Sequence, residues 1–474
     1  MAKAKAWKTG SPGEPSFPDD FEIAKRAVLQ LTDVVNNNNK YYGIELHRGG
    51  TKYRVFTHYG RTDDLETNPN AGAKESRYFD DLGSADACYA QIYKEKTAPS
   101  KGYKEVSLAS SKIGSHKARG TSSGQIDDRT LEKIEGEKEK RAAIPKSALP
   151  PGVQSMLQYI YDEATNALTT TVAAKITAHG IETPLGVLTI GQIDRGEAIL
   201  NQAFKVFEER GTKAQADLSR LSSDFYSAIP HRLGRTRAEI QSAVLDSLEE
   251  FAAKQETLQL MRDMLQVNGE SGSVLFDSEI DAKYKALNCE VGWIEPGTGP
   301  WKEIADYVER SQIKSKSVKV RNVMTLKRAG EHEAFVDGVG NHRMLFHGSR
   351  IKNWVGILSR GILLPKIVVS MGVKRTDAGW LGNGIYFGDA ACTSAFYTSP
   401  GKKGTRFMSV ARVALGKAAE YTKITYGLNG PPDGFDSCHG VRNKPGASSQ
   451  FADDEYVVYR TQQQRLEYLV EFTA

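Results

Sequence analysis

The chain has 474 residues, which is too long for one ordinary domain and indicates about three. Its 39% hydrophobic and 26% charged residues are typical of folded domains joined by polar connecting chain. The sequence has no apolar run of about 18 residues, so it predicts no membrane span. The net charge of +5 permits a nucleic-acid partner without requiring one. Four scattered cysteines without a CxxC pair argue against a zinc finger or a disulfide framework and favour a reducing compartment.

The N-terminal segments predict a tail followed by a small β-rich domain. Residues 1–20 are rich in Pro, Gly and Lys and are interpreted as a disordered tail without the apolar region of a secretory signal. Two β-prone runs, "YYGIELHR" and "TKYRVFTH", are joined by Gly49-Gly50, which predicts a hairpin. The second run ends in Tyr59-Gly60-Arg61, and "SADACYAQIYKEK" predicts a helix. Residues 21–105 therefore form the expected domain.

The middle of the chain is expected to be a linker and then a helical domain. Residues 106–146 are polar and poor in aromatic residues, which is typical of a linker. From residue 147 to residue 268 the pattern is helical, and Pro and Gly breaks separate the segments. Apolar residues with helical spacing mark two of the expected helices, namely Val153, Met156, Leu157 and Ile160, and then Ile240, Val244, Leu248 and Phe251.

Residues 272–474 predict a mixed α+β domain with an antiparallel sheet. Short β-prone runs such as "RMLFHGS", "NGIYF", "RFMSVARVAL" and "DEYVVY" alternate there with turns and modest helices. No internal repeat is evident. We expect the chemistry in this last domain.

Three fragments of the last domain carry candidate functional residues. The run "LFHGSR" delivers His347, Gly348 and Ser349 at the end of a strand; "GNGIYFGDAACTSAFY" contains Tyr386, Ser394 and Tyr397; and "DDEYVVY" places Glu455 at the start of a buried strand. Taken singly, each residue has a plain alternative, since the histidine and the tyrosines are often structural and the glutamate is often a solvated strand end. The glycines of "GNGIYFG" lead into a strand rather than a helix, which argues against a phosphate-binding loop.

Taken together, the fragments resemble the catalytic domain of the poly(ADP-ribose) polymerase family. His347 in HGS, Tyr386 in GIYF and Glu455 before an apolar strand match the His-Tyr-Glu triad of that family, and the similarity runs through roughly 200 residues. The stretches "NWVGILSRGILLPKIVVSMGVKRTDAGWLGNGIYF" and "DGFDSCHGV" resemble the vault-associated branch. "DFYSAIPH" is similar to the α-helical regulatory domain, and the hairpin that ends in Tyr59-Gly60-Arg61 resembles the WGR domain.

This resemblance implies that NAD is a substrate and that no metal takes part. Glu455 would stabilise the cationic sugar left when nicotinamide departs. Tyr397 would stack on the nicotinamide ring and Tyr386 would close its other side. The resemblance assigns the remaining NAD contacts to His347 on the adenosine-side ribose, to Gly348 and Ser394 on the carboxamide, and to Ser349, Asn353 and Gly356 along the same surface.

The resemblance also implies partners and leaves alternatives open. DNA strand breaks would bind the WGR-like domain through Tyr59, Gly60 and Arg61, where Tyr59 replaces the family's Trp; its alternative is a half-buried strand aromatic. Protein acceptors would include the chain itself, no membrane partner is expected, and the location would be nuclear, or the nucleoid or cytoplasm of a prokaryote. Leu363 stands where several relatives have an adenosine-contacting Arg. We expect a transferase that forms poly(ADP-ribose) and responds to DNA breaks; the alternatives are a mono-ADP-ribosyltransferase and a catalytically weak DNA-binding or scaffolding member.

Overall fold

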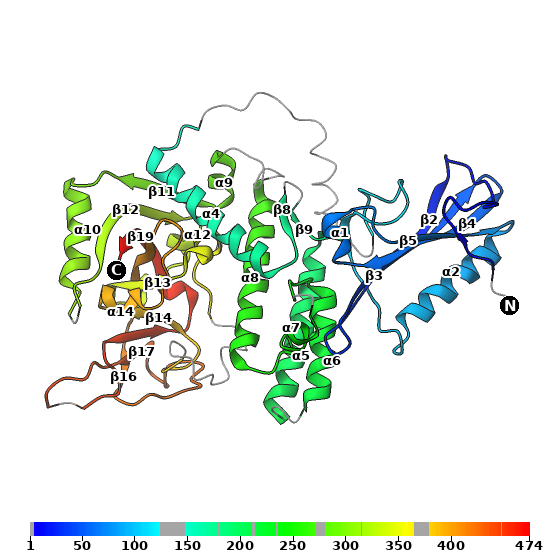
Figure 1. Cartoon of the computed structure of the whole chain (residues 1–474). Helices are drawn as coiled ribbons and strands as arrows, with labels where there is room; N and C mark the ends of the chain where they lie inside the picture. The colour runs from blue at the N-terminus through cyan, green and yellow to red at the C-terminus, as the bar shows by residue number, and fades with distance from the viewer. Residues whose placement is uncertain are drawn as a thin grey trace. The chain divides into compact units, whose positions relative to one another are not determined.

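The computed structural model describes residues 4–123, 147–177, 180–210, 214–233, 236–271, 280–313, 315–364, 379–446 and 448–474 (Figure 1). The chain forms two compact units: residues 1–142 with 168–265, and residues 143–167 with 266–474. Within the described ranges, no helix combines the length and the apolar character needed to cross a membrane.

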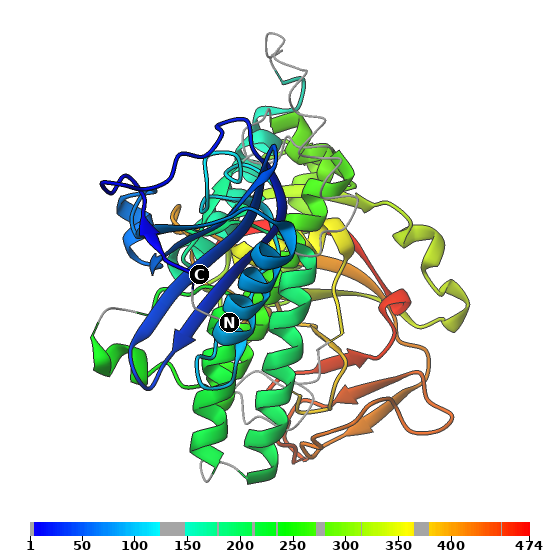
Figure 2. The ribbon, with the colours of Figure 1, turned by 90° about the vertical axis from the view of Figure 1, so that its right-hand side faces the viewer.

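The first unit begins with a twisted antiparallel sheet in the order β1-β5-β4-β3-β2-β6. Its strands are β1 (Trp7–Lys8), β2 (Glu22–Asp33), β3 (Asn38–Gly49), β4 (Lys52–Arg61), β5 (Ala73–Phe79) and β6 (Lys104–Glu105), with the short α1 (Asp64–Thr67) after β4. Helix α2 (Leu82–Thr97) lies along one face of this sheet in both views (Figures 1 and 2). The predicted hairpin is present: Gly49 pairs with Lys52, and Gly50 adopts the positive φ of 63° that the turn requires.

Two expectations for this unit are corrected. Trp7 and Lys8 pair with β5, so the described part of the N-terminal segment is not a disordered tail. The first part of the expected linker is folded, because β7 (Leu108–Ser111) forms a small sheet, β7-β10-β9-β8, with β8 (Lys175–Thr177), β9 (Gly180–Glu182) and β10 (Gly186–Leu188). These strands also mean that the helical region is not purely helical. The rest of the expected linker, residues 124–146, lies outside the described residues.

The helical region contains α4 (Pro151–Thr171), α5 (Ile190–Arg210), α6 (Gln215–Ala228), α7 (Arg237–Gln241) and α8 (Leu248–Ser271). The apolar spacing predicted for the first helix is confirmed, since Val153, Met156, Leu157 and Ile160 are buried along α4. The second predicted helix is wrong as a single element. Helix α7 ends at Gln241 and α8 begins at Leu248; between them the Leu245 N–H bonds to the Ser222 hydroxyl instead of a helical carbonyl.

The second unit contains a mostly antiparallel sheet in the order β11-β12-β19-β15-β13-β14-β18-β17-β16, in which only the β16–β17 pair is parallel among the described pairings. The strands are β11 (Cys289–Ile294), β12 (Lys319–Arg328), β13 (His342–Ser349), β14 (Ile385–Gly388), β15 (Arg406–Ala414), β16 (Ala418–Tyr421), β17 (Ser437–Gly440), β18 (Glu455–Val458) and β19 (Gln464–Thr473). The helices are α9 (Ile280–Ala286), α10 (Gly299–Arg310), α11 (Glu331–Ala334), α12 (Trp354–Arg360) and α14 (Ala391–Ala395), with the 3₁₀ turns η3 (Asp337–Val339), η4 (Ile351–Asn353) and η5 (Thr461–Gln463).

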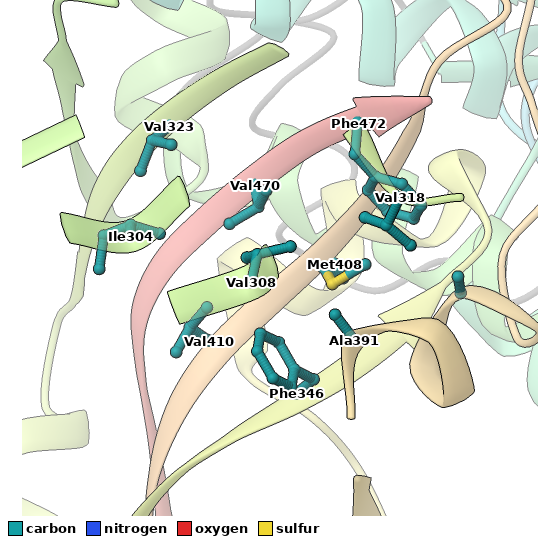
Figure 3. Packing of buried hydrophobic residues seen from close by; sticks show 11 residues of the cluster. Ile304, Val308, Val318, Val323, Phe346, Ala391, Met408, Val410, Val470 and Phe472 are labelled. Carbon is teal, nitrogen blue, oxygen red and sulfur yellow. The ribbon is translucent and has the colours of Figure 1, made fainter. Parts of the chain in front are cut away.

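A hydrophobic core under α10 holds the middle of this sheet. Phe346 of β13, Met408 and Val410 of β15 and Val308 of α10 pack together with Ala391 of α14 (Figure 3). Each of these side chains is fully buried. Because Phe346 precedes His347 and Ala391 lies on the same short helix as Ser394, this core fixes the backbone on which the site is built.

Candidate active site

Three of the predicted fragments meet at the centre of the second sheet. Strand β13 carries His347, β14 carries Tyr386 and β18 begins with Glu455, and these strands are consecutive neighbours in the sheet. The register places Gly388 of β14 opposite both Phe346 of β13 and Glu455 of β18. The structure therefore brings together residues that are far apart in the sequence.

His347 is held as a neutral ring with a defined tautomer. Its Nδ1 lies 3.0 Å from the carbonyl oxygen of Tyr386. Since a carbonyl only accepts, Nδ1 carries the proton and Nε2 is an acceptor that can receive a hydrogen bond from a sugar hydroxyl. Burial lowers the pKa of His347, which favours the uncharged ring.

Gly348 and Ser394 are brought together by close backbone packing. A Cβ atom at position 348 would lie 2.0 Å from the carbonyl oxygen of Ser394, so only glycine lets β13 and α14 approach this closely. The Ser394 hydroxyl donates to the Phe346 carbonyl at 3.1 Å. This differs from the expected donation to a carboxamide oxygen, which would require the hydroxyl to rotate away from Phe346.

The two tyrosines differ in their exposure to solvent. The Tyr386 hydroxyl donates to the Gly382 carbonyl at 2.7 Å and accepts from the Leu381 N–H at 2.8 Å. Burial raises the pKa of Tyr386; the hydrogen bond from Leu381 lowers it in part, and the Glu455 charge raises it further. Tyr397 follows α14 and is 37% exposed. The pair thus consists of one buried ring and one ring that is partly exposed.

Glu455 is a carboxyl group in an unusual environment. Its side chain is only 8% exposed, and its neighbours across the sheet are two glycines, Gly388 and Gly440. Burial and then the Asp453 charge raise the pKa of Glu455 to about 7. A carboxyl with a pKa near neutrality at the centre of a strand cluster is a candidate acid, base or electrostatic stabiliser.

The other predicted contact residues lie along the chain after His347. Asn353 ends η4 and its amide donates to the Ser349 hydroxyl at 3.2 Å. Gly356 is buried within α12. Leu363 is 40% exposed. A pocket of about 150 Å³ borders this segment, with lining that includes Arg350, Lys352 and Glu163.

A cluster of ionic side chains beside Glu455 was not predicted. Arg442 contacts the carboxylates of Asp389, Asp453 and Asp454, and Thr393 donates to Asp453 at 2.6 Å. One feature of the sequence indicates this cluster: Asp453 and Asp454 directly precede Glu455. Three consecutive carboxylates at the start of a buried strand need a positive charge nearby. Which arginine provides that charge depends on the strand pairing.

The predicted DNA-contacting residues lie in the first unit, at the end of β4. The Tyr59 ring stacks on Tyr42 at 5.2 Å between centroids, and its hydroxyl donates to Glu75. Tyr59 is thus a half-buried strand aromatic that packs against the core cluster beneath α2. The Arg61 side chain is 41% exposed and pairs with Asp63 at 3.2 Å.

Comparison with known proteins matches each part of the chain in order. Residues 25–110 match the WGR domain, residues 147–271 the poly(ADP-ribose) polymerase regulatory domain, and residues 299–449 the poly(ADP-ribose) polymerase catalytic domain. The chain belongs to the poly(ADP-ribose) polymerase family. The catalytic match includes His347 and Tyr386 and ends before Glu455.

Relatives of the family cover nearly the whole chain. The protein mono-ADP-ribosyltransferase PARP4 of Homo sapiens is 30% identical over 97% of this chain, and that of Mus musculus is 33% identical over 69%. The chain spans only 24% and 16% of the lengths of these two relatives. The protein mono-ADP-ribosyltransferase PARP3 of Mus musculus is 26% identical over 94% of this chain and is covered to 87% of its length.

Proposed function

We propose that the chain is an NAD-dependent ADP-ribosyltransferase that modifies proteins and is stimulated by DNA breaks. The observation that carries the proposal is the meeting of His347, Tyr386 and Glu455 on three adjacent strands, with Glu455 buried. The family match to the catalytic domain supports it.

The reaction would exchange one bond at the nicotinamide ribose for another. The C–N bond to nicotinamide breaks and nicotinamide leaves with the bonding electron pair, so positive charge develops on the sugar. An acceptor oxygen then forms a bond to the same carbon and loses its proton. Glu455 as a carboxylate would stabilise the cationic sugar and polarise the acceptor, and His347 Nε2 would accept from a ribose hydroxyl.

The test of this proposal is incubation of the purified chain with NAD labelled in the adenylate part, with and without nicked DNA. Label that becomes covalently attached to protein, together with released nicotinamide, supports the transfer. Absence of both products in the presence of DNA would leave the scaffolding alternative.

The length of the product separates two forms of the proposal. The expected product is a polymer, which runs as a ladder after detachment from the protein. Single-unit transfer is the second candidate, and it is favoured by the names of the relatives, since those described above are mono-ADP-ribosyltransferases. A single discrete species after detachment would establish it.

The DNA response is proposed for the first unit. A match to the WGR domain supports a nucleic-acid partner, and Arg61 is exposed enough to contact a phosphate. We propose that DNA ends bind there, that the acceptors include this chain, and that the protein acts in the DNA damage response in the nucleus, or in the nucleoid or cytoplasm of a prokaryote.

A further inference from the structure

Arg442 stands where three strand ends meet. It follows β17 by two residues, and its guanidinium lies 2.7 Å from Asp389 Oδ1, 3.5 Å from Asp453 Oδ1 and 3.5 Å from Asp454 Oδ2. Its side chain is 20% exposed. The Arg442 backbone N–H also donates to Asp454 at 3.0 Å, so both the chain and the side chain of this residue hold the entry to β18.

Each partner of Arg442 is tied to the backbone around Glu455. Asp453 and Asp454 immediately precede it, and Asp389 follows Gly388, the residue that pairs with Glu455 across β14. On the other side, Glu455 pairs with Gly440 of β17, two residues before Arg442. Arg442 therefore connects β14, β17 and β18 at the level of Glu455.

We propose that Arg442 is a positioning residue for Glu455, which clamps these three strand ends and offsets the negative charge of Asp453 beside the carboxyl. This inference rests on the proposed function, because it assumes that Glu455 acts on the nicotinamide ribose of NAD. It concerns a residue that acts through its neighbours, and Arg442 itself makes no contact with substrate in the proposal.

The balance of charge explains why an arginine is suited to this position. Three aspartates surround the guanidinium of Arg442. A guanidinium is planar and has several N–H donors, so it can contact carboxylates from different edges, whereas the ammonium group of a lysine is a single compact charge. Two of the aspartates have further partners besides Arg442: His439 Nε2 lies 2.7 Å from Asp454, and the Thr393 hydroxyl donates to Asp453. Removing the guanidinium leaves the aspartates close together beside Glu455.

Titratable and charged groups lie on or beside every strand that neighbours Glu455. They are Asp453 and Asp454 before β18, Tyr386 and Asp389 on and after β14, His439 and Arg442 on and after β17, and His347 on β13. Asp453 is the charge that acts on Glu455 most directly, after burial. Loss of Arg442 should therefore favour protonation of Glu455, and loss of the Asp453 charge should favour its ionisation.

The experiment measures transfer from NAD as a function of pH in the full chain, for the wild type, Arg442→Gln, Arg442→Lys and Asp453→Asn. We expect the midpoint of the rising limb to move up by at least ~0.5 pH units in Arg442→Gln, less in Arg442→Lys, and down in Asp453→Asn. Arg412→Gln is the matched control, because Arg412 pairs with Glu467 on β15 and β19, away from the cluster, and its midpoint should stay in place. A lower rate with an unchanged midpoint in both Arg442→Gln and Asp453→Asn would overturn the proposal.

A second readout does not depend on activity. The chain is labelled with ¹³C at glutamate side-chain carboxyls, the Glu455 resonance is assigned by its loss in Glu455→Gln, and its titration is followed in the same variants. Opposite shifts in Arg442→Gln and Asp453→Asn support the role of Arg442 even where the wild type transfers nothing, a result that would refute the proposed function alone. If Arg442→Gln fails to fold, the Asp453→Asn titration decides, and no downward shift there would contradict the proposal.

Discussion

Glu455 combines burial with a position opposite two glycines, and these features give a prediction for its removal. Glu455→Gln keeps the size and one hydrogen-bonding oxygen but removes the charge that the cationic sugar would need. Loss of one such contact costs about 10²–10³ in kcat, so transfer should fall by that factor while KM for NAD changes much less. Steady-state kinetics with labelled NAD provide the measurement, and Glu467→Gln, which removes a carboxylate paired with Arg412, is the control. Normal turnover by Glu455→Gln would disprove the catalytic assignment.

The raised pKa of Glu455 also predicts how stability depends on pH. The folded carboxyl has a pKa of about 7 against an ordinary value of 4.5, so the folded state holds this proton more tightly than the unfolded chain. This contribution to stability is full below about pH 4.5 and is lost as the pH rises to 7. Glu455→Gln lacks it, and its free energy of unfolding relative to wild type should therefore increase between pH 5 and pH 8, by roughly 3 kcal/mol at most. Urea unfolding at the two pH values tests this, and an equal difference at both would contradict the buried, protonated state.

For single residues, the sequence predicts the members of the candidate site but not the ionic contacts of Arg442, and the reason is physical. His347, Tyr386 and Glu455 stand out because their local motifs are specific as a set, and the structure places them on neighbouring strands. The link from Asp453 to Arg442 could not be read in the same way. It depends on the pairing of β17 with β18, which brings together residues from separate loops.

The junction of β13 and α14 shows how a single glycine sets the spacing of two elements. Gly348→Ala would place a methyl group 2.0 Å from the Ser394 carbonyl, so the two elements must separate. Overpacking of this kind costs about 1–3 kcal/mol, and NAD binding should weaken because Ser394 and Tyr397 move with α14. Gly430→Ala is the control, because no atom lies within 4 Å of the added methyl group there. Thermal unfolding and NAD titration of both variants give the comparison, and equal behaviour would refute the tight junction.

Elements were harder to predict where polar residues are buried. Residues 106–123 are rich in serine and lysine, as a linker is, yet Ser115 donates to the buried Glu45 at 2.6 Å and the Gly114 N–H donates to His58 at 3.1 Å. The composition of such a segment is that of a loop, because its polar groups form hydrogen bonds with buried polar groups of the sheet instead of with water. The break between α7 and α8 has a similar origin, since the hydroxyls of Ser222 and Ser247 bond to backbone N–H groups there.

For the whole molecule, the position of residues 124–146 predicts where self-modification occurs. This stretch connects the folded segment ending at Ser123 with the catalytic unit and contains several Asp, Glu and Lys side chains, although its structure lies outside the described residues. A tethered acceptor has a high effective concentration at the active site. We expect most sites of automodification between residues 124 and 146. Mass spectrometry of the chain after reaction with NAD gives the map, and sites found only outside this stretch would contradict this expectation.

The response to DNA should depend on the first unit and on how its parts are joined. The end of β2 is bonded to α6, where the Thr32 N–H donates to the Ser227 hydroxyl at 2.8 Å and the Val34 N–H donates to Ser223 at 3.1 Å, so the sheet and α6 are joined within the first unit. A shift from 1:99 to 99:1 in favour of an active state requires about 5.5 kcal/mol of differential binding by DNA, and phosphate contacts that fade with salt are the expected source.

Arg61 is the residue with which to test this, because Tyr59 is packed on Tyr42 and its removal would disturb the core of the sheet. Arg61→Ala should weaken binding to a DNA end and lower the number of counterions released on binding by about one. It should also lower the ratio of activity with DNA to activity without DNA. Arg77→Ala, whose side chain pairs with Glu75 on β5, controls for the loss of a positive charge in the same sheet. Fluorescence anisotropy with a labelled nicked duplex at several salt concentrations, combined with the transfer assay, provides both quantities. An unchanged activity ratio in Arg61→Ala, or a wild type that is fully active without DNA, would show that stimulation does not pass through this end of β4.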